Sequence, residues 1–169
     1  SGSVFQYISL WNITVESLNE EPKIITSDDL VIRLNGHYGV IFNIKFISET
    51  ELISVSDDRT VRYWNFYDKQ NNSVYSSIVF IGHTARVWNL SVVDCEKEQL
   101  IFSVGEDNSI RIFNLTKAKT NQEIKINDEN STLLNEGIIE ENKFSPSNGK
   151  NIRAIYNDSN KYVYFGGDD

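Results

Sequence analysis

The most constraining feature of this sequence is a pattern of four residue types that occurs twice in the same order. The two copies are Gly36-His37, Asp58 and Trp64-Asn65, then Gly82-His83, Asp107 and Phe113-Asn114. The His-to-Asp spacing is 21 residues in the first copy and 24 in the second, and each Asp precedes its aromatic residue by 6. This constancy indicates an internal repeat, so we expect the chain to fold as tandem copies of one small unit.

The segments between these residues predict four short strands in each copy, because apolar, β-branched and aromatic residues recur between polar turns. The predicted strands are 40–46, 52–56, 60–65 and 73–81 in the first copy, and 87–93, 99–104, 109–114 and 123–127 in the second. Tight turns at 57–59 and 106–108 join the second strand to the third. Four strands joined in this way, with Gly-His before them and Trp-Asn after the third, are typical of a WD40 β-propeller blade.

Both ends of the sequence predict partial blades. Segments 4–12 and 23–34 contain the last two strands of a preceding blade, and 151–157 and 162–165 give the first two of a following one. We therefore predict an all-β fold with about three blades' worth of four-stranded antiparallel sheets, divided at 1–35, 36–81, 82–127 and 151–169. The polar stretch 128–150 is predicted as a flexible insertion, in which Leu133, Leu134, Ile138 and Ile139 form a brief docking element. Because propellers have roughly four to eight blades, we expect a larger ring whose remainder binds this segment.

Composition restricts the environment and the surface. No apolar run approaches about 18 residues, so no membrane span is expected. Cys95 is the single cysteine, which favours a reducing, cytoplasmic location over a disulfide-bonded secreted one. The formal net charge of −8 argues against a broadly basic nucleic-acid surface, although a local basic patch remains compatible with it.

Ser, His and Asp are the residue types of a catalytic triad, so His37, Ser54 and Asp58 raise the question of catalysis. The blade pattern favours a structural interpretation, in which Asp58 accepts from the imidazole, the imidazole bonds Ser54, and Ser54 accepts from the Trp64 indole. His83, Ser103 and Asp107 repeat the arrangement. There Phe113 replaces the Trp, and we expect a network weaker by about 1 kcal/mol. In the following blade Ser147 takes the His position, Phe165 the Ser position, and only Asp169 keeps the pattern.

Metal and phosphate chemistry have little support in the sequence. No Cys/His cluster has metal-ligand spacing, and the pairs Asp57-Asp58 and Asp168-Asp169 fit turns better than ligand sets. Arg59, Arg86 and Lys150 lie on one predicted rim with Asp57, Glu106 and Asp168, and are candidate partner or RNA contacts. The alternative for Arg86 is a bridge between blades through Asp58 or Asp107. Arg62 and Arg111 are expected to face solvent or the adjacent blade. The aromatic residues expected in the core are Phe42, Phe46, Tyr63, Trp88, Phe102 and Phe113.

Several stretches resemble one family more specifically. They are 36–42, 82–88, 103–107 and 151–155 leading to 166–169, together with the opening 1–5 running into 10–11. These resemble the WD-repeat partner subunit of the eukaryotic tRNA ribose methyltransferase that modifies the wobble nucleotide. The resemblance covers nearly all of this chain except the insertion, but only a small part of the family protein.

The resemblance implies a non-catalytic subunit with no cofactor of its own. In the family, a separate FtsJ-like tRNA ribose methyltransferase binds S-adenosylmethionine, and the WD subunit holds that enzyme and places the tRNA anticodon loop in its active site. We consider two other classes. A generic WD40 scaffold for trafficking or ubiquitin ligase assembly would bind proteins and not tRNA. A propeller hydrolase would need exposed acids or His at the central channel, where the sequence offers mainly Val and Ile.

Overall fold

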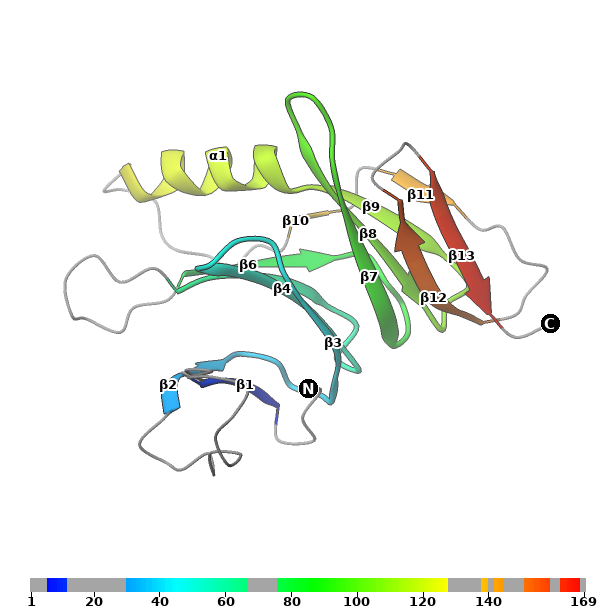
Figure 1. Ribbon diagram of the computed structural model, residues 1–169, viewed down its shortest axis with the longest axis horizontal. Helices are drawn as coiled ribbons and strands as arrows, with labels where there is room; N and C mark the ends of the chain where they lie inside the picture. Colours follow the sequence, from blue (N-terminus) through cyan, green and yellow to red (C-terminus); the bar gives the residue numbers. More distant parts are fainter. Residues whose placement is uncertain are drawn as a thin grey trace, which may run out of the picture.

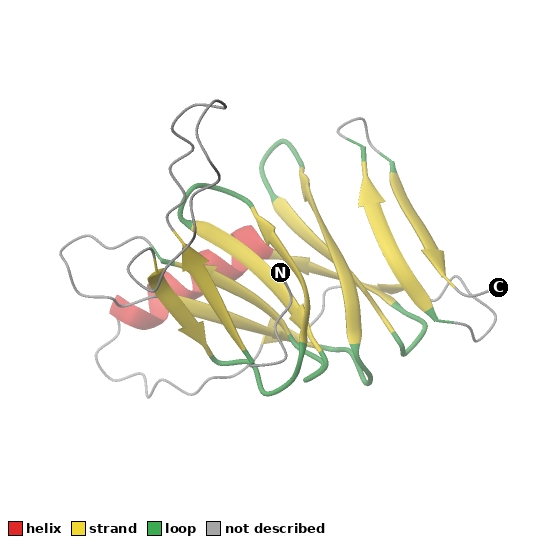
Figure 2. Ribbon diagram, turned by 60° about the horizontal axis from the view of Figure 1, so that its bottom comes forward, coloured by secondary structure: helices red, strands yellow, loops and turns green. Residues whose placement is uncertain are grey.

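The structure is a computed structural model that describes residues 6–11, 30–66, 76–127, 138–139, 142–144, 151–158 and 162–167. In these parts of the chain the strands form four sheets that stand side by side (Figures 1 and 2). The predicted all-β fold, a partial β-propeller of four-stranded antiparallel units, is confirmed. The one helix among the described residues is too short and too polar to cross a bilayer.

The first full blade has the predicted strands in consecutive antiparallel order. They are β3 (Ile41–Phe46), β4 (Glu51–Ser56), β5 (Val61–Asn65) and β6 (Ser76–Ile81). β4 is buried along most of its length, because it lies between β3 and β5 and between neighbouring blades. β6 is the outer strand of this blade. A two-residue strand, β10 (Ile138–Ile139), pairs with it in parallel and makes a fifth strand.

The second full blade contains β7 (Val87–Asp94), β8 (Gln99–Gly105) and β9 (Ile110–Asn114). Its outer position is taken by β11 (Asn142–Phe144), which pairs antiparallel with β9. This blade therefore draws its fourth strand from within the stretch that the sequence predicted as a flexible insertion. The predicted docking of Ile138 and Ile139 is confirmed by β10, whereas Leu133 and Leu134 lie outside the described residues.

The predicted fourth strand at 123–127 is wrong, because helix α1 (Leu115–Asn127) occupies this segment. Asn114 begins the helix as its N-cap, since its side-chain oxygen accepts a hydrogen bond of 3.0 Å from the backbone N–H of Lys117. Leu115 and Ala118 lie one turn apart and are both buried in the core between the two blades. Glu123, Ile124, Lys125 and Ile126 alternate polar and apolar residues as a strand does, but the Asn114 cap and the burial of Leu115 and Ala118 stabilise the helix instead.

The partial blades at both ends are two-stranded, as predicted. β1 (Tyr7–Trp11) pairs with β2 (Leu30–Asn35), and β12 (Ile152–Asn157) pairs with β13 (Val163–Gly167), both antiparallel. The inner strands β3, β7 and β12 are neighbours across successive blades (Figure 1). Each of the three carries a β-bulge at the same place near its start. This shared irregularity is an imprint of the repeat on the backbone.

The main core lies between the two full blades. Its aromatic members include Tyr63, Phe80 and Phe113, and the last two rings are 5.2 Å apart. Of the aromatic residues predicted for the core, Phe46 is wrongly placed. Phe46 is 55% exposed at the end of β3, where its ring makes an edge-to-face contact with the Phe66 ring. Burial decreases along β3, from Ile41 at its start to Phe46 at its end.

Candidate functional site

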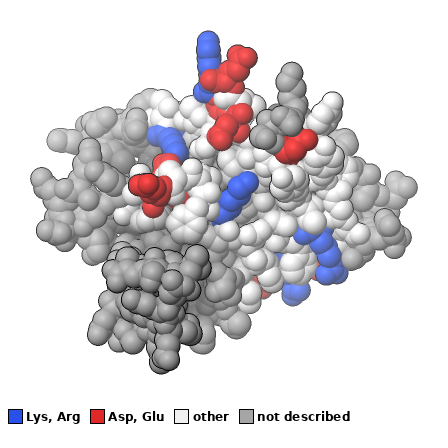
Figure 3. Space-filling model, in the orientation of Figure 1, with Lys and Arg blue, Asp and Glu red and all other residues white. Residues whose placement is uncertain are grey.

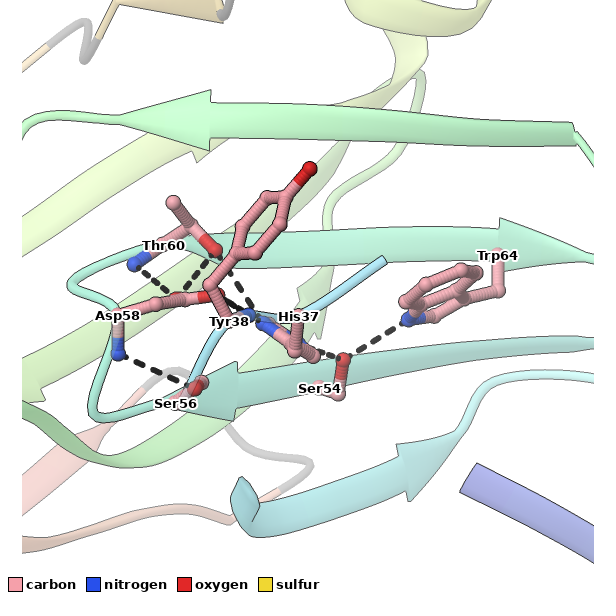
Figure 4. Close-up of polar contacts among 7 residues, drawn as sticks. All are labelled: His37, Tyr38, Ser54, Ser56, Asp58, Thr60 and Trp64. Atoms are coloured by element: carbon pink, nitrogen blue, oxygen red, sulfur yellow. Dashed lines mark hydrogen bonds and ion pairs between the residues drawn. The ribbon is translucent and has the colours of Figure 1, made fainter. Parts of the chain in front are cut away.

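The residues that look most reactive form a buried hydrogen-bonded chain in the first full blade (Figure 4). His37, from the loop before β3, lies with Nδ1 2.7 Å from Asp58 and Nε2 2.7 Å from the Ser54 hydroxyl. The Trp64 indole N–H donates to the same hydroxyl oxygen at 2.8 Å. The chain thus joins the loop before β3, strand β4, the β4–β5 turn and strand β5.

The electrostatics of this hydrogen-bonded chain favour a neutral His37 imidazole and an ionised Asp58 carboxylate. Burial lowers the pKa of His37, and the nearby Asp58 only partly opposes that effect. Burial works to raise the pKa of Asp58, but hydrogen bonds from His37, Thr60 and the Tyr38 backbone outweigh it and lower the pKa well below its usual value. A neutral ring that donates from Nδ1 to Asp58 and accepts at Nε2 from Ser54 satisfies every group in the chain.

The second full blade repeats the arrangement without the indole. His83 Nδ1 lies 3.0 Å from Asp107, and Nε2 lies 2.8 Å from the Ser103 hydroxyl. Phe113 is fully buried at the position equivalent to Trp64, and its ring has no N–H to donate. Gly105 makes the close approach possible, because a Cβ there would lie 2.8 Å from His83 Nδ1 and 2.7 Å from a backbone oxygen. Arg111 was expected at the surface or between blades, but it is buried and pairs with Asp107 at 3.3 Å.

The connectivity Asp–His–Ser is that of a hydrolytic triad, yet the geometry does not offer a nucleophile. Ser54 and Ser103 are 0% exposed, and the Ser54 oxygen is also an acceptor for Trp64. A nucleophilic hydroxyl must reach a substrate, which requires an open position beside it. Each chain therefore supports its blade by satisfying polar groups that would be costly to bury alone.

The rim that carries these turns also carries two of the predicted contact residues. Arg59 is exposed in the β4–β5 turn and has a backbone φ of 70°. Arg86 lies 2.7 Å from Asp57 and 3.8 Å from Glu106. Arg86 therefore bridges the two blades, as the alternative interpretation held, but through Asp57 instead of Asp58 or Asp107. Lys150 and Asp168 lie outside the described residues, as do Ser147 and Asp169.

A row of side chains follows the bulges of the three inner strands. Phe42 and Trp88 have ring centroids 4.7 Å apart, and they occupy equivalent bulge positions in β3 and β7. Arg153, at the same position in β12, has its guanidinium 5.6 Å from the Trp88 ring centroid. The Arg86 guanidinium lies 6.0 Å from the same ring. Cations at this distance from an indole are held by cation–π attraction, so the row joins three successive blades.

Comparison with known proteins agrees with this geometry. Residues 28–65 and 74–114 match the family described as WD domain, G-beta repeat. The chain carries WD40 repeats. The two matched stretches contain strands β2 to β9 and both hydrogen-bonded chains.

Three relatives match parts of the chain. The chain is 26% identical over 117 residues to the tRNA (34-2'-O)-methyltransferase regulator WDR6 of Drosophila melanogaster, a match covering 67% of this chain and 12% of that protein. It is 25% identical over 130 residues to the ribosome biogenesis protein YTM1 of Coccidioides immitis, covering 68% and 27%. It is 30% identical over 88 residues to ytm1 of Neurospora crassa, covering 49% and 18%. The chain thus matches about an eighth to a quarter of these relatives' lengths.

Several supporting groups in the WD40 repeats were not found from the sequence. Thr60 and Ser109 donate their hydroxyls to Asp58 and Asp107 at 2.7 and 2.6 Å. The backbone N–H groups of Tyr38 and Thr84 donate to the same two carboxylates, each at 2.9 Å. The sequence does contain a signal for the two hydroxyl donors, because a Thr or Ser stands two residues after each turn Asp. The Tyr38 ring extends away from the hydrogen-bonded groups (Figure 4) and is highly exposed.

Figure 3 shows how charge is distributed on one face of the molecule. On the face in Figure 3, basic and acidic side chains are scattered among uncharged ones and form no continuous basic block. Within the described ranges, no three His, Cys, Asp or Glu side chains are grouped to hold a metal ion. The register of β12 and β13 places Phe165 opposite Ile155, where Ser103 lies opposite Leu90 in the preceding WD40 repeat. The partial blade formed by β12 and β13 therefore lacks the Ser of the hydrogen-bonded chain, as predicted.

Proposed function

We propose that this chain is part of a non-catalytic WD40 scaffold subunit that binds an FtsJ-like tRNA 2'-O-ribose methyltransferase. The subunit places the tRNA anticodon loop so that the enzyme methylates the wobble nucleotide. The observation that carries this proposal is the match to the Drosophila regulator across two thirds of the chain. The burial of both Ser–His–Asp chains supports it, because the reactive-looking groups act as internal supports and leave the rim for binding.

The mechanism follows from positioning. A scaffold that holds enzyme and substrate together raises their effective concentration and fixes their orientation, without supplying an acid or a base. S-adenosylmethionine binds to the partner enzyme in this scheme, and the scaffold needs no cofactor.

Arg59 is our first candidate for contact with the tRNA backbone. It is exposed, it lies on the rim of the repeat turns, and its backbone is left-handed. An Arg in this conformation costs free energy that Gly would not, and such strain is often kept at binding sites. Arg86 is a weaker candidate, since Asp57 and Glu106 already neutralise it.

The full-length protein, tagged in its source cell, tests the proposal. We expect it to co-purify with tRNA and with a small methyltransferase, and loss of the protein to remove ribose methylation at position 34. Recovery of pre-ribosomal RNA and its assembly proteins would instead favour a ribosome-biogenesis scaffold, the second candidate, which the two YTM1 relatives support. Recovery of trafficking or ubiquitin-ligase components without RNA would favour a generic WD40 scaffold.

A second measurement tests the contact residue. Arg59→Ala should weaken tRNA binding and reduce the slope of log affinity against log salt by roughly 0.7–0.9, the value for one phosphate contact. Lys97→Ala is the matched control, because Lys97 is exposed in the β7–β8 turn on the opposite rim. Equal salt slopes for the two variants would exclude Arg59 as a phosphate contact.

A further inference from the structure

The outer edge of the first full blade carries a strand that does not belong to its repeat. β10 pairs in parallel with the end of β6, with Ile138 opposite Phe80 and Ile139 opposite Ile81. The pairing involves two of the six residues of β6. In the next blade, β11 pairs antiparallel with β9 and fills the fourth position, which β6 fills in this blade. The edge of β6 therefore already accepts an extended segment from elsewhere in the sequence.

The sequence of β6 lacks the usual protection of an edge strand. Natural edges are guarded by Lys, Pro, bulges or inward-pointing charges, because an open edge is a template for another strand. β6 reads Ser-Ser-Ile-Val-Phe-Ile, with neither charge nor Pro, and its pairing with β5 shows no bulge. Ile81 is 48% exposed even with β10 in place. This edge is thus apolar, straight and still accessible at its end.

We propose that the β6 edge is a strand-addition site for an extended segment of a partner protein, which takes the place of β10. The partner strand runs parallel to β6 and carries two adjacent bulky aliphatic residues, like the Ile-Ile pair it replaces. Residues opposite each other in a sheet lie on the same face. The first aliphatic residue therefore lies on the side of buried Phe80, and the second covers exposed Ile81.

The exchange is feasible because β10 is short. Two residues supply few ladder hydrogen bonds, whereas a partner strand can pair along more of the β6 edge. The tether of β10 gives it a high effective concentration, so the partner competes with it and does not meet an empty edge. This inference goes beyond the proposed function, since it concerns a protein partner and does not depend on tRNA.

A labelled peptide with the sequence of residues 135–143 serves as the probe, and the full 169-residue chain is the receptor. In the receptor, Ile138→Asn with Ile139→Asn removes the tethered competitor. We expect the peptide to bind this receptor about tenfold tighter than the unsubstituted chain. Adding Ile81→Glu should abolish binding, whereas adding Phe46→Glu, at an exposed residue at the end of β3, should leave it unchanged. Equal affinity in all four receptors would overturn the proposal.

Cross-linking tests the register without depending on the double variant. The receptor carries Ile81→Cys together with Cys95→Ser, which removes the exposed native thiol. A peptide with Cys at the position of Ile139 should form a disulfide with it, and a peptide with Cys at the position of Ile138 should not, because that residue lies on the other face. The reverse preference, or no preference, contradicts the proposed pairing. A double variant that dimerises through its own freed edge would show that the occupant is a second copy of the chain and not a partner.

Discussion

At the scale of single residues, the two repeats show how one substitution changes a buried network. Ser54 bonds both His37 and Trp64, while Ser103 bonds His83 and faces Phe113 in place of an indole. The backbone turns and the His–Asp pairs are otherwise alike in the two blades. The two networks differ in the indole donor and in the Arg111–Asp107 pair of the second blade, and the effect of the donor is open to measurement.

Ser54→Ala should destabilise the chain more than Ser103→Ala. The first change leaves two buried groups without their partner, and the second leaves one, so we expect a difference of about 1–2 kcal/mol in the free energy of unfolding. Urea denaturation followed by fluorescence measures both variants. Equal losses would mean that the Trp64 bond contributes nothing to the first blade.

Arg59 and Asn108 occupy equivalent turn positions with positive φ, 70° and 56°. Asn tolerates the left-handed conformation, whereas Arg adopts it at a cost in free energy. Arg59→Gly should therefore raise the free energy of unfolding by about 0.5–1 kcal/mol, and Asn108→Gly should change it less. A loss of stability in Arg59→Gly would show that the Arg side chain makes contacts that outweigh the strain.

At the scale of elements, the sequence specifies the strands well because they obey local rules. Alternating apolar residues and Asp turns placed β3, β4, β5, β7, β8 and β9 within about two residues of their observed ends. The outer strands were harder. β10 and β11 are two and three residues long and follow a helix, so their partners depend on tertiary contacts that no local pattern encodes. The helix was missed because Ile124 and Ile126 alternate with polar residues.

The cap on helix α1 gives a prediction at this scale. Asn114→Ala should cost about 1 kcal/mol of stability, since it removes the acceptor for the Lys117 N–H at the first turn. Asn121→Ala is the matched control, because Asn121 is exposed within the same helix, where Ala is the better helix former. Thermal unfolding should show a lower midpoint for the first variant and an unchanged or higher one for the second.

The Glu51 carboxylate links helix α1 to the first full blade. Lys119 donates to Glu51 at 2.8 Å and lies 4.7 Å from the Tyr63 ring, and the Tyr63 hydroxyl donates to Glu51 as well. Burial opposes ionisation of Glu51, but bonds from Lys119 and Tyr63 prevail and lower its pKa. Glu51→Gln should accelerate hydrogen exchange in α1. Glu49→Gln, in the turn that precedes β4 and exposed, should not; equal exchange rates in the two variants would count against this link.

At the scale of the whole molecule, the contacts between blades set the architecture. Asn43 donates to Asn89, and Ser91 donates to Asn157, so polar pairs link the inner strands of successive blades. The repeat spacing predicts that blades follow one another, but it cannot state which side chains meet across them. The Arg86–Asp57 bridge illustrates this, because the sequence interpretation paired Arg86 with Asp58 or Asp107, whereas the packing of the blades places it beside Asp57.

The buried networks together predict how the stability of the whole chain depends on pH. The pKa values of His37, Asp58 and Asp107 are lowered in the folded state. The unfolded chain therefore binds protons at a higher pH than the folded chain does. Stability is fully present above the unfolded values and is lost as pH falls towards the folded ones. His37 begins to destabilise the fold below about pH 6.5, and the two carboxylates add to this below about pH 4.

Urea unfolding between pH 8 and pH 3 should show that the free energy of unfolding falls as the pH is lowered. Each proton that the unfolded chain binds in excess of the folded chain adds about 1.4 kcal/mol per pH unit to the slope of this free energy against pH. Titration of the folded chain by NMR should place the His37 midpoint below the value of a free imidazole. His37→Gln should flatten the profile between pH 7 and pH 5, while Asp57→Asn, next to the network but outside it, should leave that region unchanged. Stability that rose from pH 7 to pH 5 would mean that the imidazole is charged in the fold, and the support role assigned to it would then fail.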